Sequence, residues 1–321
     1  MKHNSLKKVI SILIISVLGF VGCAEKTPPV PNMKQPKFQV DKELYPFASH
    51  YITLQDGSKI HYVDEGEGNT TILLLHGNPT WSFLYRKMIP SLAKDFRVIA
   101  PDYPGFGLSY AAKDFDFKAA SQAKEMNEFF DKLHLDNVII MMQDWGGPIG
   151  FDIAIHHKRN IKGFVIGNTW AWPLERFGQK GFSTLYGGWY GQFISWSYDG
   201  IVSFFMAHGV EHELSKRELA MYHAPFQDPN NRKQTYIFPA ELWDAKKFLS
   251  QVYQNLPSLS DQPVLLVWGE EDFAFQEPER TRFEHIFGNH TTVLLQDAGH
   301  FVQEDAPKEI VEAIKKWHFN K

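Results

Sequence analysis

The sequence predicts an α/β fold in which a mainly parallel sheet is covered by helices on both faces. Short, almost continuously apolar runs, such as residues 71–75, 138–142 and 163–167, alternate with segments that favour helices. Strands that are apolar on both sides have to be buried on both sides, which is typical of parallel sheets between helical layers. With 321 residues, the chain is long enough for one such domain with an insertion.

The first elements of this domain are expected to form a β-hairpin. Residues 51–54 and 59–63 favour strands, and Asp56-Gly57 between them is typical of a tight turn. Ligands of such sheets bind at the carboxyl ends of the parallel strands. Further strands are expected at 71–75, 96–100, 138–142, 163–167, 263–268 and 291–295, and helices at about 119–133, 146–157, 278–287 and 307–317.

A long stretch interrupts this alternation after the strand at 163–167. It is rich in Trp, Tyr, Phe and Gly, and we interpret it as a mostly helical insertion that forms a cap over the pocket. The core is therefore assigned to residues 41–169 and 254–321, and the cap to residues 170–253.

The first residues have the layout of a secretory signal. Lysines precede the apolar run 9–21, which is short for a membrane span and ends at Gly22-Cys23. Residues 1–22 are expected to be a signal peptide. The end of this segment resembles a bacterial lipobox, which implies cleavage before Cys23 and lipidation of its sulfur. An uncleaved N-terminal anchor is the alternative, and either reading places the protein in the cell envelope as an exported protein.

Residues 23–40 are rich in proline and favour an extended tether between membrane and catalytic domain. Cys23 is the only cysteine, so an internal disulfide is impossible. The formal net charge of −4 gives no reason to expect a nucleic-acid partner. We expect a monomer that meets the membrane only through its N-terminal anchor.

The segment from Gln143 to Gly147 indicates a nucleophile elbow, a sharp turn from a strand into a helix that presents one side chain to the active site. Asp144 occupies the nucleophile position, where Ser is common. An ionised carboxylate needs no base to attack an alkyl carbon, and the resulting ester can be hydrolysed in a second step. Met142 is large for its place two residues before the nucleophile, but its side chain is flexible enough to fit.

Asp144, Asp272 and His300 follow expected strands in the order nucleophile, acid, base, which is the order of the α/β-hydrolase fold. Glu270 and Glu271 compete with Asp272 for the role of acid. The other position used for the acid, after the strand at 163–167, is occupied by an asparagine, so Asp272 is the better candidate.

These motifs make the sequence resemble the haloalkane dehalogenases, a branch of the α/β hydrolases, over residues 45–320. The resemblance implies an enzyme that converts a small haloalkane and water into an alcohol, a halide and a proton, without a metal or an organic cofactor. The matching segments are His76–Trp81, Leu84–Arg86, Pro101–Gly107, Gln143–Gly147, Gly269–Asp272 and Gly299-His300.

The resemblance also implies the halide site. The Trp145 indole N–H and the Asn78 carboxamide are donors that carry no negative charge, and they match residues that hold the halide in the family. Their main-chain N–H groups would form the oxyanion hole. Trp196 resembles a second halide donor of one subgroup, but that subgroup has Glu in place of Asn78, so we favour Asn78 with Trp145. His76 and Asp102 are expected to be structural.

Two other functions remain open at this point. An epoxide hydrolase shares the triad and uses tyrosines of the cap as acids, and the chain has five candidates; Asn78 argues against it, because an aromatic residue is usual there. A non-catalytic lipoprotein that senses a small apolar ligand is the third possibility, although a receptor has no need of a complete triad. The candidate cap tyrosines are Tyr186, Tyr190, Tyr198, Tyr222 and Tyr236.

Overall fold

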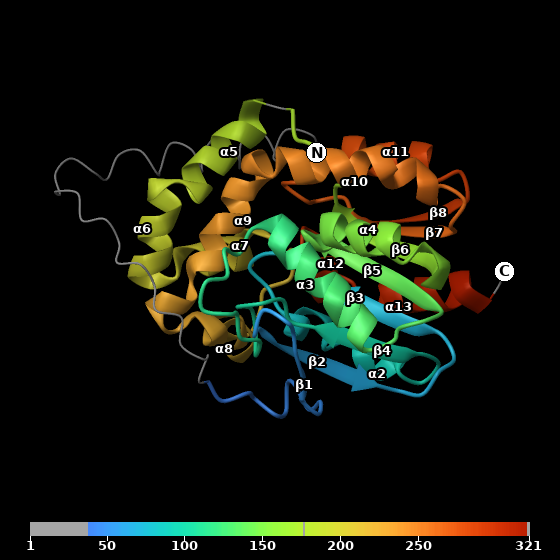
Figure 1. The fold of residues 1–321 in the computed structure, drawn as a ribbon, viewed down its shortest axis with the longest axis horizontal. Helices are drawn as coiled ribbons and strands as arrows, with labels where there is room; N and C mark the ends of the chain where they lie inside the picture. Colours follow the sequence, from blue (N-terminus) through green and yellow to red (C-terminus); the bar gives the residue numbers. More distant parts are fainter. Residues whose placement is uncertain (1–37, 176, 320–321) are drawn as a thin grey trace.

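The computed structural model describes residues 38–175 and 177–319. These residues contain an eight-stranded sheet with the strand order β1-β2-β4-β3-β5-β6-β7-β8 (Figure 1). The six strands β4-β3-β5-β6-β7-β8 are parallel to one another, whereas β2 pairs antiparallel with both β1 and β4. The bounds are β1 His50–Thr53, β2 Lys59–Glu65, β3 Thr71–Leu75, β4 Arg97–Pro101, β5 Val138–Asp144, β6 Ile161–Thr169, β7 Val264–Gly269 and β8 His290–Leu295.

Helices cover the sheet, as the apolar strands required. Every residue of β3, β5 and β7 is buried, and α4 packs on β3, β5 and β6 with α3 beside it. The helices of the core are α2 Ile89–Leu92, α3 Ala119–Lys132, α4 Gly146–His156, α11 Glu277–Ile286, α12 Val302–Asp305 and α13 Pro307–Phe319. The predicted α/β fold with a mainly parallel sheet is confirmed. The short helices α2 and α12 were not expected, because four residues are too few to show a helical period.

The segment between β6 and β7 is helical. Figure 1 shows α5 to α8 gathered to one side of the sheet, next to the carboxyl ends of the central strands. The last helix of the segment, α10, packs on α4 through Phe248, Leu249 and Val252, so the expected boundary after residue 253 falls inside a helix that covers the core. The helices are α5 Phe177–Gly187, α6 Trp189–Tyr198, α7 Gly200–His208, α8 Lys216–His223, α9 Lys233–Asp244 and α10 Lys246–Asn255.

The expected signal peptide and Cys23 lie outside the described residues, as does most of the expected tether. Within residues 38–175 and 177–319, none of the helices has both the length and the apolar character needed to cross a membrane.

Candidate active site

Asp144 is the last residue of β5, and its backbone has a φ of +50°, in the left-handed region that L-residues seldom adopt. The turn into α4 is too crowded for side chains. A Cβ atom on Gly146 would lie 2.3 Å from the Leu75 carbonyl oxygen, and one on Gly147 would lie 2.0 Å from Thr169 Oγ1. The two glycines therefore permit the strained turn that lifts Asp144 out of the sheet, as the elbow motif predicted.

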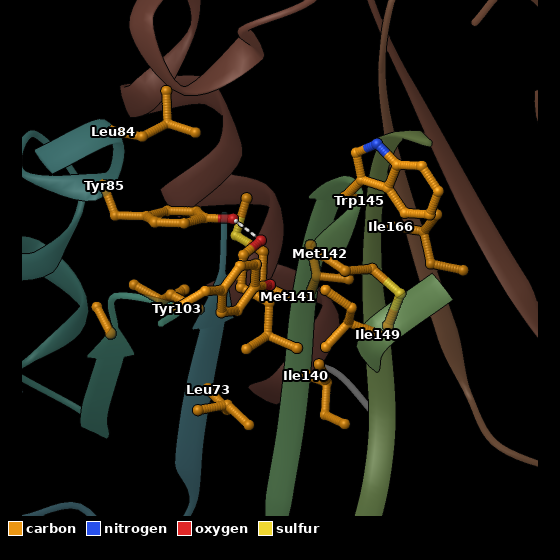
Figure 2. Packing of buried hydrophobic residues seen from close by; sticks show 14 of the residues in the cluster. Leu73, Leu84, Tyr85, Tyr103, Ile140, Met141, Met142, Trp145, Ile149 and Ile166 are labelled. Carbon is orange, nitrogen blue, oxygen red and sulfur yellow. Dashed lines mark hydrogen bonds between the residues drawn. The ribbon is translucent and has the colours of Figure 1, made fainter. Parts of the chain in front are cut away.

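Met142 fits beneath this turn because the facing helix, α4, has a glycine without a side chain at that point. A Cβ atom on Gly150 of α4 would lie 3.3 Å from Met142 Cε, so the glycine leaves the room that the large side chain occupies. Figure 2 shows Met142 beside Ile149 in the interior below Trp145. All of these side chains are buried, which gives the elbow a rigid base.

The structure brings Asp144, Asp272 and His300 together from three separate strand ends. His300 Nδ1 lies 3.0 Å from Asp272 Oδ2, and His300 Nε2 lies 3.6 Å from Asp144 Oδ2. All three residues are buried. The imidazole therefore bridges the two carboxylates, in the arrangement of a nucleophile, a base and an orienting acid.

The charge on His300 depends on both carboxylates. Burial by itself would lower the pKa of the imidazole, but the negative charges of Asp272 and Asp144 outweigh it and raise the pKa of His300 to about 10. A proton on His300 is therefore favoured for as long as both neighbours stay ionised.

Gln143 contacts the same imidazole and has the opposite effect on its charge. The sequence did not indicate this contact. Its Nε2 donates to the His300 carbonyl oxygen at 3.0 Å and also lies 3.0 Å from His300 Nε2. The bond to the carbonyl identifies this amide atom as the nitrogen. A donor that faces His300 Nε2 favours the neutral ring, whose lone pair accepts the hydrogen bond.

Asn168 provides a hydrogen-bond donor for the buried carboxylate of Asp272. Its Nδ2 donates to Asp272 Oδ2 at 2.9 Å, and its Oδ1 accepts a hydrogen bond from Gly269 N at 2.7 Å. The backbone N–H of Ala274 donates to the other carboxylate oxygen at 2.7 Å. The sequence marked Asn168 only as a position without a carboxylate, whereas in the structure it orients Asp272.

Asn78 adjoins the nucleophile at the end of β3. Its main-chain N–H donates to Asp144 Oδ1 at 2.8 Å, and its carboxamide donates to the Thr235 carbonyl oxygen of α9 at 3.2 Å. Trp145 is the residue between Asp144 and α4, and its ring contacts Trp170 edge to face. The Trp145 side chain is buried, and its indole N–H is a hydrogen-bond donor. Asn78 retains a second amide hydrogen, so both side chains can donate to a further group.

Trp196 does not join this group. It lies on α6 with 44% of its surface exposed, whereas a second halide donor would have to line a closed pocket. This exposure gives no support to the possible role as a second halide donor, and Asn78 with Trp145 remain the favoured pair. Cys23, the expected lipidation site, lies outside the described residues.

His76 and Asp102 shape the loops that carry Asn78. His76 Nδ1 donates to the Gly77 carbonyl oxygen at 2.9 Å, and its Nε2 accepts a hydrogen bond from Tyr103 N at 3.2 Å. Burial lowers the pKa of His76 to about 4, so the ring is neutral at pH 7. Asp102 accepts hydrogen bonds from Ser82 N and Leu108 N. These bonds stabilise the turn, in line with the structural roles expected.

The fold, with a buried Asp–His–Asp arrangement at the strand ends, is that of an α/β hydrolase. A family model described as the alpha/beta hydrolase fold matches residues 70–307. A relative from Mycobacterium tuberculosis (strain ATCC 25618 / H37Rv), named haloalkane dehalogenase 2, is 39% identical over 279 residues, which cover 86% of this chain and 97% of the relative. The chain belongs to the haloalkane dehalogenases, a family of α/β hydrolases that act on carbon–halogen bonds.

Two further comparisons place the chain among its neighbours. The crystal structure of an ancestral haloalkane dehalogenase aligns with a TM-score of 0.76 and 26% identity, over 84% of this chain and 97% of that one. A second relative, from Shewanella oneidensis, is 30% identical over 293 residues, covering 86% of this chain and 89% of the relative. That protein is named a cis-3-alkyl-4-alkyloxetan-2-one decarboxylase, so similar chains carry a different chemistry.

Proposed function

We propose that the protein hydrolyses a carbon–halogen bond through a covalent ester on Asp144. In the first step a carboxylate oxygen of Asp144 attacks the halogen-bearing carbon, the carbon–halogen bond breaks, and the halide leaves with the electron pair. The side-chain donors of Asn78 and Trp145 stabilise the departing anion, because they are positioned before charge develops. The substrate is a small haloalkane.

The second step regenerates the enzyme. His300 takes a proton from water, and the oxygen of that water attacks the carboxyl carbon of the ester. The tetrahedral oxyanion accepts hydrogen bonds from the main-chain N–H groups of Asn78 and Trp145. Its collapse breaks the bond between the carboxyl carbon and the alkyl oxygen, which takes the proton of the added hydroxyl and leaves as the alcohol, so that the carboxylate of Asp144 is restored. Asp272 stabilises the imidazolium that forms, and the proton then leaves to solvent.

The ester also adjusts the base. Alkylation removes the negative charge of Asp144, which is one of the two charges that raise the pKa of His300. The Gln143 amide then favours the neutral ring further. The base therefore becomes able to accept a proton when the second step requires it. The observation that carries the proposal is the buried bridge of His300 between Asp272 and an elbow carboxylate.

Trapping of the intermediate tests the scheme directly. Asp144→Asn should abolish halide release from 1,2-dibromoethane and 1-bromobutane, followed with a pH indicator. His300→Phe should release one equivalent of halide and then stop, with an alkyl adduct on Asp144 in the mass spectrum. Asp297→Asn, which changes an exposed carboxylate, is the matched control and should turn over normally. Substrate consumption by His300→Phe without an adduct would refute the covalent step.

Epoxide hydrolysis receives less support from the cap tyrosines. Tyr222 donates its hydroxyl to Glu304, and Tyr198 is exposed. Burial raises the pKa of Tyr186 to about 12 and also raises that of Tyr236, which makes both weaker acids. Turnover of styrene oxide without release of halide from any bromoalkane would favour this alternative.

The Shewanella relative motivates one more arm of the same assay. An oxetan-2-one is a four-membered cyclic ester, and its decarboxylation releases no halide. Halide donors would then have no function, so turnover of a cis-3,4-dialkyloxetan-2-one without any dehalogenation would overturn the proposal. A folded protein inert toward all three substrate classes would favour a sensor of small apolar ligands.

We also propose that the protein is exported as a monomer and is held at the membrane by a lipid on Cys23. The lipid alone would be sufficient for anchoring. The apolar run before Gly22-Cys23 supports this, because it ends as a lipobox does. Incorporation of labelled palmitate into the wild-type chain, and its loss in Cys23→Ser, would be the expected result. Equal labelling of both chains would contradict it.

A further inference from the structure

Helix α6 exposes a row of aromatic side chains on its outer side. Trp189, Trp196 and Tyr198 are 63%, 44% and 61% exposed. Trp189 and Trp196 are two helical turns apart and therefore lie on the same side of the helix. Phe193 lies between them, with its ring stacked on Trp189 at a centroid distance of 6.0 Å. We refer to Trp189, Phe193 and Trp196 as the aromatic face, because Tyr198, two positions after Trp196, lies on another side of the helix.

The chain segment that carries the aromatic face has few charged residues. Across residues 177–210 the sequence has one carboxylate, Asp199, one lysine, Lys180, no arginine and one histidine, His208. Asp199 is buried and accepts from His223 at 2.7 Å, which leaves Lys180 as the charge that this segment presents. Surfaces that face only water usually carry many charges of both signs. Trp and Tyr without charges are instead typical of the boundary between water and lipid.

The N-terminal tether joins the domain at the cap. Asp41 accepts two hydrogen bonds from Arg217 of α8, at 2.8 and 2.9 Å, and Arg217 also donates to Glu43 at 2.7 Å. Figure 1 shows α8 and α6 on the same side of the molecule. Residues 24–37 can span at most about 50 Å. A lipid on Cys23 would therefore hold the domain by its cap side.

We propose that the aromatic face rests on the surface of a lipid bilayer, so that the anchored enzyme receives its substrate from the lipid phase. This inference depends on the proposed anchoring at Cys23. The inner side of α6 connects to the reaction site: Ser195 Oγ lies 2.8 Å from Thr235 Oγ1, and the Thr235 carbonyl oxygen accepts from Asn78. One helix, α9, thus lies between α6 and the halide donor. Apolar haloalkanes concentrate in lipid, so this orientation brings the cap to the phase that holds them.

A fluorescent probe on the full-length chain tests the contact. Ser197 is exposed beside Trp196, and Ser197→Cys labelled with an environment-sensitive nitrobenzoxadiazole group would report on the aromatic face. Asn289→Cys, exposed before β8, is the matched control, and the unsubstituted chain reports any label on Cys23. Each protein is reconstituted into phosphatidylcholine vesicles, and spin-labelled phosphatidylcholine is added as the quencher. We expect a blue shift and quenching at position 197 and neither at position 289.

Substitution of the face provides the second measurement. Trp189→Ser with Trp196→Ser should abolish the blue shift at position 197, whereas Leu294→Ser, at an equally exposed apolar position on β8, should leave it unchanged. Co-flotation with the vesicles reports the anchor separately. Proteins that float with an unshifted probe would overturn the lipid contact while leaving the anchor intact, and proteins that do not float would overturn both. A blue shift without vesicles would assign the face to a second copy or to the apolar N-terminal run instead.

Discussion

Replacement of Asp144 by Asn should lower the pKa of His300 substantially, because it removes one of the two charges that favour the imidazolium. Asp144 Oδ2 lies 3.6 Å from His300 Nε2. At that distance, with an effective dielectric constant of about 20, two unit charges attract by about 4 to 5 kcal/mol, which corresponds to a shift of roughly 3 pH units. The pKa of His300, raised to about 10 in the native protein, should therefore fall to roughly 7.

The titration can be followed by NMR of histidine-labelled protein. The chain has 14 histidines, and the His300 signal is assigned as the one missing from His300→Gln. Asp297→Asn removes an exposed carboxylate three positions before His300 and should leave the midpoint unchanged, because solvent screens that charge. We expect the titration midpoint of His300 to fall by roughly 3 pH units in Asp144→Asn. A midpoint within about half a unit of the native value would refute the idea that esterification of Asp144 lowers the pKa of His300.

Three further predictions concern the surroundings of the triad. Gln143→Leu removes the donor that favours neutral His300, so hydrolysis of the ester in single-turnover experiments should need a higher pH; an unshifted profile would exclude this role. Gly147→Ala places a Cβ atom 2.0 Å from Thr169 Oγ1 and should lower the free energy of unfolding, measured in urea, by about 1–3 kcal/mol. Gly178→Ala, with open space around its Cβ, should not lower it. Equal effects of the two substitutions would refute the crowding at Gly147. The stability contributed by protonated His300 is fully present below pH 6.5 and is lost as the pH rises to about 10. The melting temperature of His300→Gln should therefore change less with pH in that window than the melting temperature of the native protein. Parallel curves of melting temperature against pH would contradict this.

Short sequence patterns were sufficient to predict much of the candidate site. The run from Val138 to Met142 predicts a buried strand wherever it occurs, and Asp144 followed by Trp and two glycines predicts the elbow, because the turn excludes side chains close in sequence. The proximity of Asp272 and His300 to Asp144 followed from their places after strands, since carboxyl ends of parallel strands meet at one edge of a sheet.

Supporting contacts could not be predicted in this way. Gln143 and His300 are 157 positions apart, and Asn168 and Asp272 are 104 apart, and no periodicity relates residues at such separations. Amide side chains on strands are common, so neither residue type indicates a partner. Their functions exist only after the strands have aligned.

The sequence by itself determined the fold class and the elbow turn at Asp144, because strand burial and turn sterics are properties of short segments. Only the tertiary structure decided which side of α6 faces solvent. Trp196 resembles an inward-facing halide donor in its local sequence, yet Ser195 beside it contacts Thr235 and thereby turns Trp196 outward. The direction of a side chain on a helix depends on what the opposite side packs against, and that neighbour comes from elsewhere in the chain.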